Sequence, residues 1–123
     1  MVWEGQEKRR YPRARFLCRM TVISPKRLLV SHTENIGEGG VRVILEEKLG
    51  VRTTVGLEVF VEKERPIKSK GRVVWVAESL NPIEGKPLLF DTGIEFIEMD
   101  DAARQYISKL VDSILAQEKN KEE

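Results

Sequence analysis

Between residues 14 and 97, apolar side chains recur in short runs that alternate with polar positions and end at turn-forming residues. In the first run Phe16, Cys18, Met20 and Val22 fall on one face, as the two-residue period of a half-buried strand requires. The same alternation returns five more times before residue 97, with no helical period between the runs. The predicted strands cover about 16–22, 28–34, 41–45, 55–61, 68–76 and 88–96.

The period changes after residue 100. Apolar residues now follow the spacing of one helical stripe, namely Ala103, Tyr106, Ile107, Leu110, Val111 and Ile114. Asp100 or Asp101 is the expected N-cap, and the charged residues 117–123 are expected to fray. The pattern predicts a mainly β fold, a six-stranded antiparallel barrel with a C-terminal amphipathic helix over an opening, spanning residues 14–116. Residues 1–13 are predicted to form a flexible basic arm.

Composition restricts the class of protein. The 123 residues suit one domain, and 41% hydrophobic with 33% charged residues is ordinary for a globular chain. No apolar run approaches the roughly 20 residues that span a bilayer, and the N-terminus has no apolar leader, so we expect a cytoplasmic protein without membrane insertion. One cysteine and one histidine predict neither a disulfide nor a zinc site, and we expect no metal and no cofactor.

The net charge of +1 conceals an asymmetry along the chain. Residues 1–27 hold eight Lys/Arg and two Glu, whereas residues 94–123 hold eight acidic and four basic side chains. An anionic partner would therefore bind near the N-terminal end. Charge alone equally allows two solvated faces that neutralise each other.

Two short segments carry the candidate chemistry. The first is Arg9-Arg10-Tyr11-Pro12-Arg13, which precedes the first strand and which we expect to be an arm. The planar, forked guanidinium group of arginine binds phosphates and the O6/N7 edge of guanine. A solubilising basic arm is the alternative for this segment taken alone.

The second segment is Asn35-Ile36-Gly37-Glu38-Gly39-Gly40, between two predicted strands. Glycines allow a ligand to approach the main chain closely, and an asparagine can donate and accept at a base edge or a phosphate. A plain hairpin uses the same residues. No Lys-Ser/Thr follows the glycines, so this is not a Walker loop.

Taken together, the order of RRYPR, NIGEGG, KGRVVWV and GIEFIEMDDAARQYISKLV resembles a PilZ domain over about residues 7–115. The family motif RxxxR is matched by Arg9 and Arg13, and the motif D/N-x-S-x-x-G by Asn35 and Gly40. The resemblance implies a six-stranded barrel with a C-terminal helix, whose motif residues bind cyclic di-GMP. The motif serine is replaced by Gly37, and the loss of one hydroxyl contact would weaken binding by roughly 2- to 13-fold.

Trp75 is the remaining candidate for ligand contact. Because residues 73–76 are all apolar, alternation does not fix its direction, and it is either a core residue or a platform that stacks on guanine, as the family resemblance implies. Arg10, Arg42 and Arg72 are candidate secondary phosphate contacts. His32 and Cys18 are predicted to be structural.

The sequence therefore favours a receptor over an enzyme. The chain has no nucleophile-base pair and no recognisable carboxylate dyad, so no catalytic residues are predicted. We expect a cyclic di-GMP receptor or adaptor that orders its arm on binding and signals to an unknown downstream protein. The alternative is a PilZ-like protein-interaction module that has lost nucleotide binding. A nucleic-acid polymer is not expected as partner, because the strands lack a row of exposed aromatics.

Overall fold

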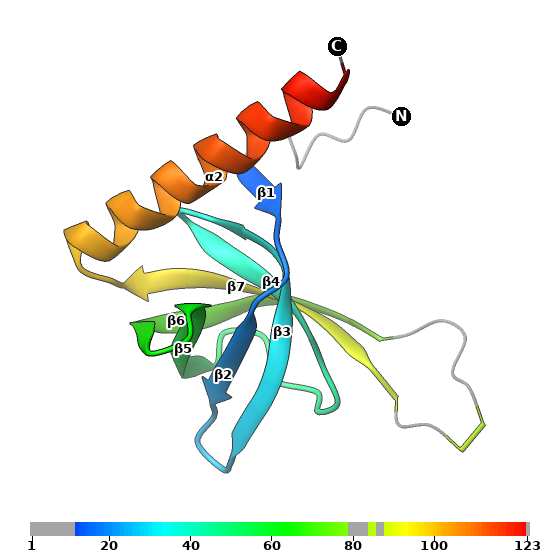
Figure 1. Ribbon diagram of the computed structural model, residues 1–123. Helices are drawn as coiled ribbons and strands as arrows, with labels where there is room; N and C mark the ends of the chain where they lie inside the picture. The colour runs from blue at the N-terminus through cyan, green and yellow to red at the C-terminus, as the bar shows by residue number, and fades with distance from the viewer. Residues whose placement is uncertain (1–11, 79–83, 86–87, 123) are drawn as a thin grey trace.

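The computed structural model describes residues 12–78, 84–85 and 88–122, with side chains described as far as Lys119. These residues form seven strands and one helix. The elements are β1 (Arg13–Arg15), β2 (Arg19–Ile23), β3 (Leu28–Gly37), β4 (Gly40–Leu45), β5 (Thr54–Glu62), β6 (Arg65–Glu78), β7 (Phe90–Glu98) and α2 (Asp101–Glu122). Figure 1 shows the strands wrapped into a barrel, with α2 lying across one end.

The sheet closes on itself through six strands. The strand order is β1-β3-β2-β5-β6-β7-β4. An additional antiparallel pairing between β3 and β4 closes the six strands from β3 to β4 into a barrel. The predicted six-stranded antiparallel barrel is confirmed. Strand β1 is an extra strand that pairs with the end of β3, where Arg13 is opposite Gly37 and Arg15 is opposite Asn35.

The barrel interior is filled by the alternating apolar positions that the sequence indicated. Met20, Val22, Val41, Val43 and Ile94 are completely buried in one continuous cluster. Burial of such side chains stabilises the fold by about 1.5 to 3 kcal/mol each. The core therefore fixes which residues of each strand face outward, and the candidate site is built from those.

Helix α2 covers one opening of the barrel with most of the predicted stripe, from which Tyr106 departs because it is 40% exposed. Ile107 and Val111 are fully buried, and the Asp100 carboxylate accepts a hydrogen bond of 2.8 Å from the Ala103 backbone N–H, so Asp100 is the N-cap. The helix continues to Glu122, beyond the residue at which fraying was expected to begin, and the fraying itself stays a prediction. Gln, Glu and Lys in this stretch are good helix formers, and they extend the helix without apolar anchors.

Two further differences concern strand limits. Arg13 was expected to lie in the arm, but it belongs to β1 because its backbone pairs with β3 at Gly37. The hairpin between β5 and β6 turns at residues 63 and 64, so Arg65 and Pro66, which precede the predicted strand 68–76, already belong to β6. Among the residues that the structure describes, no helix combines the length and apolar character needed to cross a membrane.

Candidate functional site

The glycine-rich segment is a tight hairpin held by two other elements. Asn35, Ile36 and Gly37 end β3, Gly40 begins β4, and Glu38 and Gly39 make the turn. The Phe96 backbone N–H donates to the Gly39 carbonyl at 2.9 Å, and Arg104 Nη1 of α2 donates to the Glu38 carbonyl at 3.1 Å. The hairpin is thereby fixed to both β7 and α2.

Gly40 has a packing reason to lack a side chain. A Cβ at this position would meet the Ile94 carbonyl oxygen and lie 3.0 Å from the Glu95 Cα, both backbone atoms of β7. The last glycine of the motif therefore allows β4 and β7 to approach each other. We find no open space at Gly40 on the side where a side chain would project.

Gly37 is covered by β1. A Cβ there would lie 2.7 Å from the Pro12 carbonyl oxygen and 2.8 Å from Arg13 Cγ. Arg13 then continues along the outer face, where its Nη1 donates a long hydrogen bond of 3.5 Å to Asn35 Oδ1. Three of the predicted site residues, Arg13, Asn35 and Gly37, are thus brought together on one patch.

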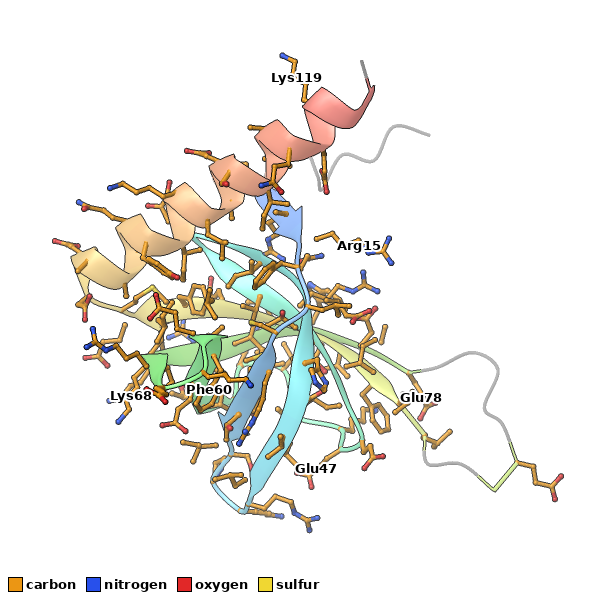
Figure 2. All side chains as sticks on the ribbon, viewed as in Figure 1. Arg15, Glu47, Phe60, Lys68, Glu78 and Lys119 are labelled. Carbon is orange, nitrogen blue, oxygen red and sulfur yellow. The ribbon has the colours of Figure 1, made fainter. Side chains whose placement is uncertain are left out.

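A row of paired residues extends from this patch around the outside of the barrel. The register aligns Arg15 with Asn35, Asn35 with Arg42, Arg42 with Gly93, and Gly93 with Trp75. Directly paired residues project on the same face of a sheet. The row therefore combines basic, amide and aromatic side chains, and Figure 2 shows Arg15 at its β1 end, extending away from α2.

Trp75 lies on the outer surface and is 39% exposed, so of the two possibilities left open by the sequence, the core position is wrong. Its indole covers Gly93, where a Cβ would collide with the ring atoms Nε1, Cε2 and Cδ1. An irregularity in the β6–β7 pairing between Val73 and Trp75 changes the alternation, since Val74 and Trp75 are consecutive and are both exposed, at 41% and 39%. The indole is therefore a fixed aromatic surface at the far end of the row.

Two of the candidate phosphate contacts are already paired with carboxylates. Arg42 donates from Nε and Nη2 to the two carboxylate oxygens of Asp91, at 2.8 and 2.7 Å. This bidentate contact raises the pKa of Arg42 and holds its guanidinium in one orientation. Arg72 makes a longer contact of 3.4 Å with Glu95. The pairing with Asp91 was not predicted, since Asp91 and Arg42 are far apart in sequence.

Four residues named in the sequence analysis remain, namely Arg9, Arg10, Cys18 and His32. Arg9 and Arg10 lie outside the described residues. Cys18 is buried, its Sγ accepts one hydrogen bond from Thr33 Oγ1, and its burial raises the pKa of the thiol, whereas His32 is exposed on the outer face of β3.

The fold and the polar outer row define a small closed barrel with a candidate anion-binding face. Residues 7–113 match the model of the PilZ domain, so the chain belongs to the PilZ domain family. The match includes both motifs, from Arg9 to Gly40. A comparison with curated proteins finds no match.

Solved structures share the barrel at low sequence identity. The PilZ domain of Escherichia coli YcgR with cyclic di-GMP gives a TM-score of 0.71 at 15% identity, covering 93% of this chain and 96% of that one. Bacillus subtilis MotI/DgrA, an inhibitor of motility, gives 0.68 at 18%, covering 93% and 52%. The K. pneumonia MrkH complex with cyclic di-GMP gives 0.71 at 15%, covering 93% and 55%. The present chain thus spans about half the length of the MotI and MrkH chains.

Proposed function

We propose that the protein is a cytoplasmic receptor for cyclic di-GMP that binds the dinucleotide on the outer row of the barrel. The observation that carries this proposal is the meeting of Arg13 and Asn35 beside a row that ends at an exposed indole. Membership of the PilZ family and the presence of cyclic di-GMP in the related YcgR domain support the choice of ligand.

The polar end of the row suits phosphate and guanine. Arginine offers a planar fork of donors to a phosphate or to the O6 and N7 acceptors of guanine. Arg13 and Arg15 supply such forks from β1, and Asn35, which is paired with Arg15 and accepts a hydrogen bond from Arg13, can donate and accept. Arg9 and Arg10 are assigned to the same ligand from the sequence motif, and with them the segment that precedes β1 would order over the bound nucleotide.

The aromatic end of the row suits a base. Base-aromatic stacking contributes about 1 to 3 kcal/mol per base, and Trp75 offers the side of its ring that does not contact Gly93. Arg42, held by Asp91, lies between the two ends as a preoriented cation. Binding would form and break no covalent bond, so the protein would act by presenting a new surface to a downstream protein.

The alternative function is a protein-interaction module that has lost nucleotide binding. The observation in its favour is at Gly37, where the motif serine is missing and Pro12 and Arg13 pack against the position. In this version Arg13 and Asn35 would remain as a structural pair, and the outer row would contact protein instead of nucleotide.

Calorimetric titration separates the two functions. We expect cyclic di-GMP to bind with a submicromolar to tens of micromolar Kd, and cyclic di-AMP more weakly, because adenine presents an acceptor and a donor where guanine presents two acceptors. GTP serves as the control for binding of any guanine nucleotide. Absence of heat at about 100 µM cyclic di-GMP, above that range, would rule out the receptor and favour the interaction module.

A further inference from the structure

A second surface, distinct from the outer row, lies where β3 and β4 separate. The two strands pair at Thr33, Asn35 and Ile36 of β3, and toward the start of β3 they diverge. The opening between them is a groove of about 570 Å³. The Ser31 hydroxyl donates to the Ile44 carbonyl across it, and Arg27 and Glu47, next in sequence to the lining residues Leu28 and Glu46, form an ion pair of 3.0 Å.

The backbone of β3 has free hydrogen-bonding groups on this side. Ser24 N–H donates to the Arg27 carbonyl and Thr33 N–H to the Cys18 carbonyl, so the odd-numbered residues of β3 bond to β2. In an antiparallel ladder the intervening residues point their N–H and C=O the other way. Leu28 and Val30 therefore turn these groups toward the groove, and in the described part of the chain no strand pairs with them there.

The side chains that line the groove are apolar with an acidic margin. Leu28 and Val30 are each 59% exposed, and Leu89 is 42% exposed. The polar lining residues are Ser31, His32, Glu34 and Glu46, and of these Glu34 and Glu46 are anionic. Such clustered exposed apolar residues mark sites of protein contact, and the two carboxylates select a partner that carries positive charge.

From these observations we propose that the groove binds a short extended segment of a partner protein that alternates apolar residues with Lys or Arg. The segment adds its backbone to the open edge of β3 at Leu28 and Val30, its apolar side chains contact those two residues and Leu89, and its cation lies at Glu34 and Glu46. Strand addition of this kind takes affinity from main-chain hydrogen bonds and specificity from alternate side chains. The proposal is independent of nucleotide binding.

The test is to select peptides that bind the purified full chain, without nucleotide, from a random peptide library displayed on phage. We expect the enriched peptides to alternate apolar residues with Lys or Arg and to bind the Val30→Lys variant at least roughly tenfold more weakly, about 1.4 kcal/mol. Val51→Lys is the matched control, because Val51 is 55% exposed and does not line the groove. Bound peptide should also slow hydrogen exchange of the Leu28 and Val30 amides.

Several results would overturn the proposal. These are a selection without enrichment, enriched peptides that are acidic, equal binding to wild type and Val30→Lys, and unchanged exchange at the two amides. Sedimentation of the unliganded chain tests a second copy as occupant, and a concentration-dependent dimer that Val30→Lys abolishes would assign the groove to self-association. Circular dichroism of Val30→Lys verifies that the barrel remains folded.

Discussion

The indole of Trp75 lies over Gly93, its directly paired neighbour on β7, and occupies the space that a side chain at Gly93 would need. The glycine thus lets a large aromatic ring lie flat against the outside of the barrel. One ring face is supported by the sheet, and the side chain remains 39% exposed. A supported ring loses little conformational entropy when a base stacks on it, which suits the proposed nucleotide site.

The first prediction concerns this ring. Trp75→Ala should weaken cyclic di-GMP binding by about 5- to 150-fold, the value of one lost stacking contact of 1 to 3 kcal/mol. It should cost well under the 3 to 5 kcal/mol of unfolding free energy that a buried tryptophan costs on truncation. Calorimetry and thermal unfolding measure the two effects. Val74→Ala is the control, since Val74 is similarly exposed on the same strand, and equal binding by both variants would exclude stacking.

The direction of Trp75 could not be predicted from sequence because four consecutive apolar residues, 73–76, hide the two-residue period. The irregularity of β6 opposite β7 decides it, and that irregularity depends on pairing between distant residues. By contrast, the alternation of apolar and polar residues is clear in the first predicted run, and Met20 and Val22 lie in the interior as predicted.

The candidate site likewise has features that the sequence predicted and features that it did not. The motif spacing indicated Arg13, Asn35 and Gly37 together, and the structure places them on one patch. The sequence did not indicate that Arg13 is a strand residue, because its pairing partner in β3, Gly37, is 24 residues away. The bidentate contact of Arg42 with Asp91 was missed for the same reason.

The second prediction tests Arg13 as a ligand contact. Arg13→Ala should weaken cyclic di-GMP binding by at least roughly tenfold, since a charge-assisted hydrogen bond contributes about 1.5 to 3 kcal/mol. Its side chain is only part-buried, so the free energy of unfolding should change by about 1 kcal/mol or less. Calorimetry and denaturant unfolding measure both. Arg65→Ala, an exposed arginine outside the row, is the control, and a large loss of stability in Arg13→Ala alone would make Arg13 a structural residue.

The third prediction concerns backbone strain between β4 and β5. Arg52 has a φ of 79°, in the left-handed region that costs a residue with a side chain about 1 to 2 kcal/mol. Arg52→Gly should therefore raise the free energy of unfolding by about 0.5 to 1 kcal/mol, after the larger entropy loss of glycine is subtracted. Urea unfolding measures the change. Val51→Gly, next to it but without a positive φ, should be destabilising, and an Arg52→Gly variant that is equally destabilised would contradict this account.

The fourth prediction is a pH dependence that arises at Cys18. Burial raises the pKa of this thiol above its ordinary value of 9.0, against a smaller opposite effect of the Thr33 hydrogen bond. A raised pKa in the folded state favours the protonated thiol, so its contribution to stability is complete below about pH 9 and is lost as pH rises through the folded-state pKa. Wild type should lose more stability than Cys18→Ala between pH 8 and about 10.5. Identical slopes in the two proteins would show that the thiol does not titrate with unfolding.

The last prediction addresses the missing serine. Since only Gly85 among the described glycines has a positive φ, the backbone at Gly37 is accessible to serine, and the obstacle is instead Pro12 and Arg13 within 2.8 Å of the new Cβ. Gly37→Ser should lower the free energy of unfolding by about 1 to 3 kcal/mol, as overpacking does. Gly37→Ala separates crowding from hydroxyl chemistry, because it adds the same Cβ alone. We expect both variants to bind cyclic di-GMP no more tightly than wild type. If serine binds about 2- to 13-fold more tightly than alanine, the recovered hydroxyl contacts the ligand and β1 moves aside when nucleotide binds.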